Sequence, residues 1–255
     1  MINSLQGKHA LVTGGAHGIG GAVAEALHAA GAQVTITGRN TEKLDATASR
    51  LAGCRAYELD VADEAAVGKV FATAVNAAGP IEVLINNAGI AGSSPFMKIK
   101  TDDVRRLMEV NLIGTLTCSQ QVLPGMLDAG WGRIVNIASL AGLMGHAYIA
   151  PYCASKHAVV GLTRALALEV ARTEITVNAV CPGYVETGMV EQAISAITSK
   201  TGRTAEEART SLADMNPQGQ IVQPEGVAAT VMWLCQPGAE SVTGQSIAMS
   251  GGQWM

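Results

Sequence analysis

The sequence predicts an α/β fold in which a doubly wound parallel sheet of about seven strands carries helices on both faces. Apolar, β-prone segments alternate with helical ones from the start of the chain, which is the pattern of repeated βαβ units. A glycine cluster follows the first strand directly. The length of 255 residues suits one large domain, and we expect residues 1–255 to form it.

Short apolar or β-branched runs predict the strands His9–Thr13, Gln33–Thr37, Ala56–Leu59, Ile81–Ile85, Arg133–Ala138, Ile175–Val180 and Ser246–Met249. Helical spacing predicts the helices Gly20–Ala30, Thr41–Leu51, Asp63–Ala77, Thr101–Asp128, Pro151–Arg172 and Pro224–Cys235. Thr41 is the expected N-cap of its helix, and Pro151 suits a first helical turn. Segment 186–222 is polar and only weakly helical. We expect it to form an irregular lid over the active cleft, with a plain surface insertion as the alternative.

Composition excludes several classes of protein. Hydrophobic residues make up 48% of the chain and charged residues 15%, which excludes global disorder. The net charge is −4 and no basic run stands out, so neither nucleic acid nor a membrane is an expected partner. A local basic group, Lys98, Lys100, Arg105 and Arg106, is either a solvated helix face or a patch for an acidic carrier or coenzyme A.

The cysteines indicate the compartment. Their number is five, which is odd, and no CxxC pair occurs. This argues against a disulfide framework and against a zinc site, and it favours a reducing cytoplasm, so we expect a cytoplasmic protein. No cluster of metal ligands is visible in the sequence.

The glycine cluster TGGAHGIG lies between the first strand and the first helix. Gly14, Gly18 and Gly20 allow a tight turn and a close approach of a pyrophosphate to the backbone. The helix that follows directs free N–H groups and a positive dipole end toward such an anion. The cluster therefore predicts a dinucleotide site in a Rossmann-type fold.

The spacing Gly-x-x-x-Gly-x-Gly resembles the nucleotide loop of short-chain dehydrogenases/reductases, in their small single-domain branch. Further motifs in the same order extend the resemblance over nearly the whole chain. Asp60-Val61 resembles the pair that holds the adenine ring, Asn86-Asn87-Ala88-Gly89 the motif beside the adenosine ribose, and Pro182-Gly183 with Thr187 the loop that holds the nicotinamide amide. The resemblance implies these cofactor contacts: Gly14, His17, Gly18, Ile19, Gly20, Asp60, Val61, Asn87, Gly89, Pro182, Gly183, Val185 and Thr187.

The end of the second strand bears on the choice of cofactor. A carboxylate there would accept hydrogen bonds from the ribose 2′-hydroxyl of NAD. This sequence has Thr37-Gly38-Arg39-Asn40 instead, and Arg39 can pair with a 2′-phosphate, assisted by His17 if it is protonated. We therefore favour NADP(H), with NAD(H) as the alternative if Arg39 is solvated or stacks on the adenine.

Four residues predict the chemistry. Tyr152 and Lys156 are four residues apart near the start of a helix and so share a face. The pKa of a free tyrosine is about 10, and a neighbouring ammonium would lower it. Ser139 follows the fifth strand and can bind the reacting oxygen. Asn111 is unfavourable inside a helix, and a kink that holds a water would explain it.

Together these four residues resemble the Asn–Ser–Tyr–Lys tetrad of the family. The resemblance implies that Tyr152 is the acid/base and that Lys156 lowers its pKa and binds the nicotinamide ribose. It also implies that Ser139 positions the carbonyl and that Asn111 supports a proton relay. Both Tyr152 and Lys156 would then contact the cofactor as well as the reacting groups.

The resemblance implies an NAD(P)-dependent oxidoreductase that transfers hydride between nicotinamide and a carbonyl or secondary alcohol. Segment 150–183 looks most like bacterial ketoreductases of 3-oxoacyl thioesters and aromatic polyketides, so a coenzyme A or carrier-protein thioester is a candidate substrate. The alternatives are a secondary-alcohol, sugar or polyol dehydrogenase and a non-catalytic dinucleotide-binding sensor.

The expected substrate contacts are Ser139 and Tyr152, with His146 from the strand-to-helix loop and Met189 from the lid. For His146, a loop histidine without such a role is the equal alternative. Relatives of this kind are usually tetramers, so a homotetramer is expected.

Overall fold

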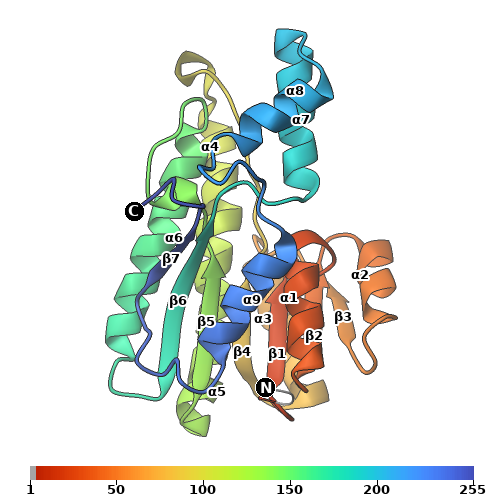
Figure 1. Cartoon of the computed structure of the whole chain (residues 1–255). Helices are drawn as coiled ribbons and strands as arrows, with labels where there is room; N and C mark the ends of the chain where they lie inside the picture. Colours follow the sequence, from red (N-terminus) through yellow and green to blue (C-terminus); the bar gives the residue numbers. More distant parts are fainter. Residues whose placement is uncertain (1–3) are drawn as a thin grey trace.

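The computed structural model describes residues 4–255, so residues 1–3 of the predicted domain lie outside it (Figure 1). One seven-stranded parallel sheet has the strand order β3-β2-β1-β4-β5-β6-β7, which confirms the predicted doubly wound sheet. The strands are β1 His9–Thr13, β2 Gln33–Gly38, β3 Arg55–Glu58, β4 Ile81–Asn86, β5 Gly132–Ile137, β6 Ile175–Pro182 and β7 Ser246–Met249.

Helices cover both faces of this sheet. They are α1 Gly18–Ala29, α2 Thr41–Ala48, α3 Glu64–Ala78, α4 Thr101–Met108, α5 Gly114–Ala129, α6 Ala150–Glu169, α7 Gly188–Thr201, α8 Ala205–Ala213 and α9 Pro224–Cys235. Val12 of β1 packs among residues of α1, α2 and α9, whereas its neighbour Leu11 packs among residues of α3 and α5. No helix within residues 4–255 is both long and apolar enough to cross a membrane.

Several helix boundaries differ from the predicted ones by one to three residues, and local hydrogen bonds accompany two of these differences. Asn40 rather than Thr41 is the N-cap of α2, because its backbone is extended and its side chain accepts a hydrogen bond from the Lys43 N–H at 2.9 Å. Helix α6 ends three residues earlier than predicted. There the Thr173 hydroxyl donates to the carbonyl oxygen of Val170 and closes the turn.

The predicted long helix 101–128 is interrupted at Asn111. A π-helical turn, η2 Glu109–Ile113, separates α4 from α5. Within it the carbonyl oxygen of Asn111 accepts a hydrogen bond from the Thr115 hydroxyl at 2.8 Å. The unfavourable residue therefore marks a real irregularity of the helix.

Segment 186–222 is more regular than predicted, because α7 and α8 form a packed helical pair. Their shared apolar cluster comprises Val190, Ile194, Ala208, Leu212 and Ile221. Thr204 and Glu207 form a reciprocal capping box at the start of α8. In Figure 1 the pair stands beyond the sheet at the upper right. The apolar residues are few and pack within the pair and against Ile221, so the helical pattern in the sequence is weak.

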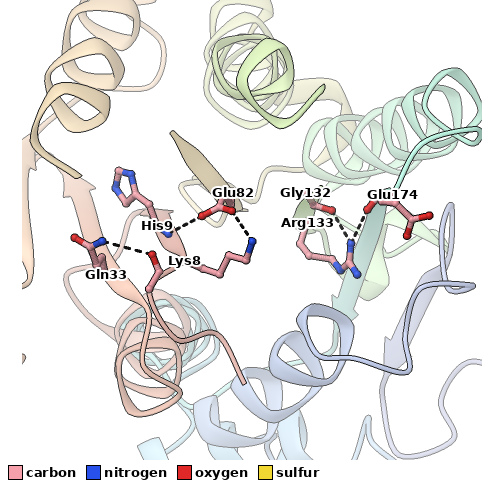
Figure 2. Close-up of polar contacts among 8 residues, drawn as sticks. Lys8, His9, Gln33, Glu82, Gly132, Arg133 and Glu174 are labelled. Carbon is pink, nitrogen blue, oxygen red and sulfur yellow. Dashed lines mark hydrogen bonds and ion pairs between the residues drawn. The ribbon is translucent and has the colours of Figure 1, made fainter. Parts of the chain in front are cut away.

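Charged side chains form ion pairs and hydrogen bonds at the amino ends of the central strands, opposite the glycine loop (Figure 2). Lys8 pairs with Glu82 at 2.6 Å. The guanidinium of Arg133 is buried, and it donates to the carbonyl oxygens of Gly132 at 2.9 Å and Glu174 at 2.8 Å. These contacts compensate for the burial of a charge at the edge farthest from the glycine loop.

His9 begins β1 in the same region and is fully buried. Its Nδ1 lies 2.8 Å from the Gly79 carbonyl oxygen and its Nε2 lies 2.9 Å from the Thr35 hydroxyl. Since a carbonyl only accepts, Nδ1 carries the proton of the neutral ring. Burial lowers the pKa of His9 below its ordinary value, and the opposing bond to Gly79 does not restore it.

We therefore expect acid to weaken the fold through His9. Below the ordinary pKa of about 6.5 the unfolded chain binds a proton that the folded chain does not, so stability falls as the pH falls. Each unit by which folding lowers this pKa is worth up to about 1.4 kcal/mol. Urea unfolding at pH 7.5 and 5.5 should show a smaller loss for His9→Gln than for the wild type. Equal losses would contradict the expectation.

Candidate active site

The glycine loop forms a tight cradle at the start of α1. Gly14 and Gly18 have left-handed backbones, with φ of 64° and 57°. A Cβ at Gly20 would lie 2.2 Å from the carbonyl oxygen of Gly14. His17 is the N-cap residue of α1 and makes no side-chain cap bond, so the helix presents its first N–H groups to an incoming anion. Ile19 lies in this first turn.

Four hydrogen bonds join the start of the glycine loop to the residues that follow β4. The Asn87 side chain donates to the carbonyl oxygens of Thr13 and Gly14, both at 3.0 Å. In return the Thr13 hydroxyl accepts the N–H groups of Asn87 and Ala88, also at 3.0 Å. The structure thus uses the Asn87 side chain to hold the loop. The sequence reasoning missed Thr13, although it directly precedes the glycines.

The predicted adenine end lies beyond β2 and β3. Arg39 is exposed there. Asp60 accepts a hydrogen bond from Arg106 at 2.8 Å and another from the Ala62 N–H. Burial opposes ionisation of Asp60, but these bonds and the charge of Arg39 bring its pKa below the ordinary value. Val61 packs closely against the start of α5, where a Cβ on Gly114 would clash with it.

His17 is neutral at pH 7, because burial and the nearby charge of Lys43 lower its pKa below the ordinary value. From the sequence we expect a protonated His17 to assist Arg39, but this form is disfavoured at pH 7.

The predicted nicotinamide end lies after β6. Gly183 follows Pro182 and donates its N–H to the carbonyl oxygen of Met249 at 3.0 Å. Val185 forms an isolated bridge with Val222, and Thr187 caps the start of α7. A Cβ on Gly18 would lie 3.1 Å from the Thr187 methyl group, so the loop after β6 touches the glycine loop.

Tyr152 and Lys156 lie in the first turns of α6. Ser139 lies two residues after the end of β5 and caps the short 3-10 turn Leu140–Gly142. The Lys156 ammonium lies 5.8 Å from the centre of the Tyr152 ring and donates to the Ile137 carbonyl oxygen at 2.8 Å. The Ser139 side chain lies close enough to the Tyr152 side chain to favour its ionised form. The structure thus brings together three of the predicted residues.

Burial sets the protonation of this group. It raises the pKa of Tyr152 to about 12, so the predicted lowering by Lys156 is not found, and only the Ser139 side chain acts in the opposite direction. It lowers the pKa of Lys156 to about 8. At neutral pH the phenol therefore keeps its proton, and the amine remains largely cationic.

Asn111 reaches α6 through a residue that the sequence reasoning missed. Its side-chain N–H donates to the Ser155 hydroxyl at 2.9 Å and to the Ile90 carbonyl oxygen at 3.0 Å. The Ser155 hydroxyl in turn donates to the carbonyl oxygen of Tyr152 at 2.9 Å. The sequence feature that points to Ser155 is its position between Tyr152 and Lys156.

Two glycines allow the surrounding loops to approach these side chains. A Cβ on Gly89 would lie 3.2 Å from Asn111 Oδ1 and 3.6 Å from Lys156 Nζ. A Cβ on Gly142 would lie 2.7 Å from the Lys156 carbonyl oxygen. A side chain at Gly142 would therefore clash with the backbone of α6, and Gly89 brings the loop after β4 close to both Asn111 and Lys156.

An open apolar groove of about 430 Å³ lies beside the start of α6. Its lining residues are Phe96, Ile99, Val104, Ala150 and Pro151, the last of which precedes Tyr152. The sequence reasoning did not foresee this groove.

The loop before α6 contains a strained residue, Tyr148, whose left-handed φ of 68° is rare for a non-glycine residue. Its carbonyl oxygen accepts the Ser94 N–H at 2.7 Å, which ties the loops after β4 and β5 together. His146 lies in the same loop, and burial lowers its pKa, so it is neutral at pH 7. Met189 is half-exposed in the first turn of α7.

Comparisons with known proteins identify the family and the fold. Residues 8–198 match the family model for short chain dehydrogenase. The chain is 42% identical to a putative ketoacyl reductase of Streptomyces coelicolor over 95% of both chains. It is 37% identical to a 3-oxoacyl-[acyl-carrier-protein] reductase of Aquifex aeolicus over 98% of both. The crystal structure of a variant of actinorhodin polyketide ketoreductase with NADPH superposes with a TM-score of 0.94, at 40% identity and 99% coverage of both chains.

The two neighbouring glycines at the start of α1 provide a test of the cradle. We expect Gly20→Ala to weaken NADPH binding at least about tenfold, because the new Cβ would meet the backbone of the loop. Gly21→Ala makes only ordinary contacts, the nearest at 3.8 Å, and should bind within about twofold of the wild type. Fluorescence titration measures both constants. Equal weakening in the two variants would contradict the assignment of this loop.

Proposed function

Because the chain belongs to the short-chain dehydrogenase/reductase family of oxidoreductases, we propose that it is an NADPH-dependent ketoreductase. Its proposed substrate is a 3-oxoacyl or polyketide thioester carried by coenzyme A or by a carrier protein. One observation carries the proposal: the Tyr152 phenol lies with the Ser139 hydroxyl and the Lys156 ammonium beside an open apolar groove.

The cofactor cradle fits a nicotinamide dinucleotide, because its glycines leave the space and the free N–H groups that a pyrophosphate needs. When bound, NADPH supplies the hydride. We assign the pyrophosphate to the glycine loop, the adenine to Asp60 and Val61, and the nicotinamide to the loop after β6. The residues proposed to hold it are Gly14, His17, Gly18, Ile19, Gly20, Arg39, Asp60, Val61, Asn87, Gly89, Tyr152, Lys156, Pro182, Gly183, Val185 and Thr187.

Arg39 supports the preference for NADPH over NADH. No carboxylate ends β2, and Arg39 is exposed and forms no ion pair within residues 4–255. A guanidinium in this position can bind a 2′-phosphate through charge-assisted hydrogen bonds.

The four tetrad residues divide the chemical work. Tyr152 donates its phenolic proton to the oxygen of the reduced carbonyl, and the Ser139 hydroxyl holds that oxygen by a hydrogen bond. The Lys156 ammonium stabilises the phenolate that remains. Asn111 fixes the first turn of α6 through Ser155. The reverse order of these steps would oxidise a secondary alcohol.

The substrate would lie between the apolar groove and the helical pair α7–α8, which we propose as a lid. In this arrangement His146 and Met189 contact the part of the substrate beyond the reacting carbonyl. Leu127 of α5 and Leu168 of α6 are exposed apolar residues, which supports a homotetramer packed through these helices. The five unpaired cysteines support a reducing cytoplasm as its location.

We expect Tyr152→Phe to reduce turnover of 3-oxoacyl thioesters at least about a hundredfold, because it removes the proton donor. The dissociation constant for NADPH should stay within about threefold. NADPH consumption on a panel of thioesters and simple ketones measures the first quantity, and fluorescence titration the second. Turnover confined to polyols or simple alcohols with NADP⁺ would favour a dehydrogenase. Tight cofactor binding without any turnover would favour a sensor.

Removing the charge of Arg39 tests the cofactor preference. Arg39→Gln should weaken NADPH binding about tenfold or more and leave NADH binding within about twofold, because only NADPH has the 2′-phosphate. Arg50→Gln is a matched control, since Arg50 is an exposed arginine just beyond α2 that pairs with Glu25. Equal effects of Arg39→Gln on both cofactors would refute the role of Arg39.

A further inference from the structure

A closed circuit of hydrogen bonds joins α5, α6, β4 and β5 below the tetrad. We call it the polar ring. Its side chains are all at most 6% exposed. They are Asn86, Asn111, Thr115, Ser119, Asn136, Ser155 and Thr163.

The upper part of the ring links the π-helical turn η2, which leads into α5, directly to α6. Asn111 donates to the Ser155 hydroxyl of α6 at 2.9 Å. Along α5, the Thr115 hydroxyl donates to the carbonyl oxygen of Asn111, and the Ser119 hydroxyl to that of Thr115, both at 2.8 Å. These three residues are spaced by four and therefore form one polar stripe on the helix.

The lower part links the same helices through the sheet. Asn86 donates to the Ser119 hydroxyl at 3.1 Å and to Asn136 Oδ1 at 2.9 Å, and the two asparagines are register partners on β4 and β5. Asn136 donates to the Thr163 hydroxyl of α6 at 2.9 Å, and Thr163 donates to the Val159 carbonyl oxygen. The backbone of α6 closes the circuit.

Stability alone does not account for the ring. The cluster beside it consists of residues such as Leu84, Val122 and Ile134, and similar apolar residues would fill these positions without desolvating amides. Asn86 Oδ1 is buried and finds no hydrogen-bond partner within residues 4–255, which is a further cost. Hydrogen bonds differ from apolar contacts in being directional, so the ring fixes positions that apolar packing would leave adjustable.

The ring fixes the position of α6, which carries Tyr152 and Lys156. Thr163 lies seven residues after Lys156, so it shares the face of α6 that carries Lys156 and Tyr152. The contact of Asn111 with Ser155 orients the start of α6. A second directional contact at Thr163, about 12 Å farther along the axis, fixes the orientation of the helix over a longer span.

We propose that Ser119, Asn136 and Thr163 are positioning residues for proton transfer. They hold α6 against α5 and the sheet from below, so that Tyr152 and Lys156 meet Asn111 in a single arrangement. The inference rests on the proposed function, since it assigns these residues to the same reaction. A misplacement of about 1 Å at a reacting group is enough to slow turnover by up to about a hundredfold.

The test is the isosteric substitution Thr163→Val, which removes the hydroxyl and preserves the volume. We expect kcat to fall about tenfold, whereas the KM for the thioester and the Kd for NADPH stay within about twofold. Thr163→Ser restores the hydroxyl and should return kcat to within about twofold of the wild type. Asn136→Leu should reproduce the effect of Thr163→Val.

Thr35→Val is the matched control. Thr35 is fully buried in β2, and its hydroxyl bonds to His9 at the amino end of β1, away from Tyr152 and Lys156. Loss of this hydroxyl should therefore lower the unfolding temperature without lowering kcat. If Thr163→Val does not fold, Ser119→Ala removes a single hydroxyl and is measured in the same way, with the same expected loss of kcat.

The possible outcomes distinguish the proposed ketoreductase function from the positioning role of the polar ring. A wild-type protein that binds NADPH but reduces no carbonyl compound would overturn the proposed function, and the inference with it. An active wild type in which Thr163→Val keeps its kcat would overturn the inference alone. So would an equal loss of kcat in Thr35→Val.

Discussion

The site depends on the joint between the carboxyl ends of β1 and β4. These strands are neighbours at the centre of the sheet, where the winding of the chain reverses and leaves a crevice. Thr13 and Asn87 join them by hydrogen bonds that run in both directions. This joint fixes the glycine loop to β4, and β4 pairs in turn with β5, which leads to Ser139. The glycine loop and Ser139 are therefore held at the same edge of the sheet.

The chemistry depends on burial acting in opposite directions on two neighbours. Burial raises the pKa of Tyr152 to about 12 and lowers that of Lys156 to about 8. The stable state at neutral pH is thus a neutral phenol beside an ammonium. Loss of the phenolic proton would leave a buried anion with an ammonium 5.8 Å from the centre of its ring, which costs less than an isolated buried anion.

Local geometry explains which features could be predicted from the sequence. The strands β1 and β7 and the helix α9 match their predicted bounds, and the four-residue spacing of Tyr152 and Lys156 is a property of a single helix. The polar ring was not foreseen, because its cross-element bonds join residues 27 to 50 positions apart. The sequence predicts an irregular segment where α7 and α8 lie, because the apolar cluster of this pair is small and is completed by Ile221 from outside both helices.

That self-contained packing of α7 and α8 has an evolutionary consequence. Their apolar cluster draws only on residues from Val190 to Ile221, and Arg209 ties the pair together through Glu186 and Glu191. Mutations that remodel this segment leave the interior of the sheet untouched, so the stability threshold that restricts core mutations bears less heavily on it. If this pair forms the proposed lid, substrate range and folding can diverge independently along one lineage, and a mutagenesis library confined to these helices would vary the substrate range at little cost to folding.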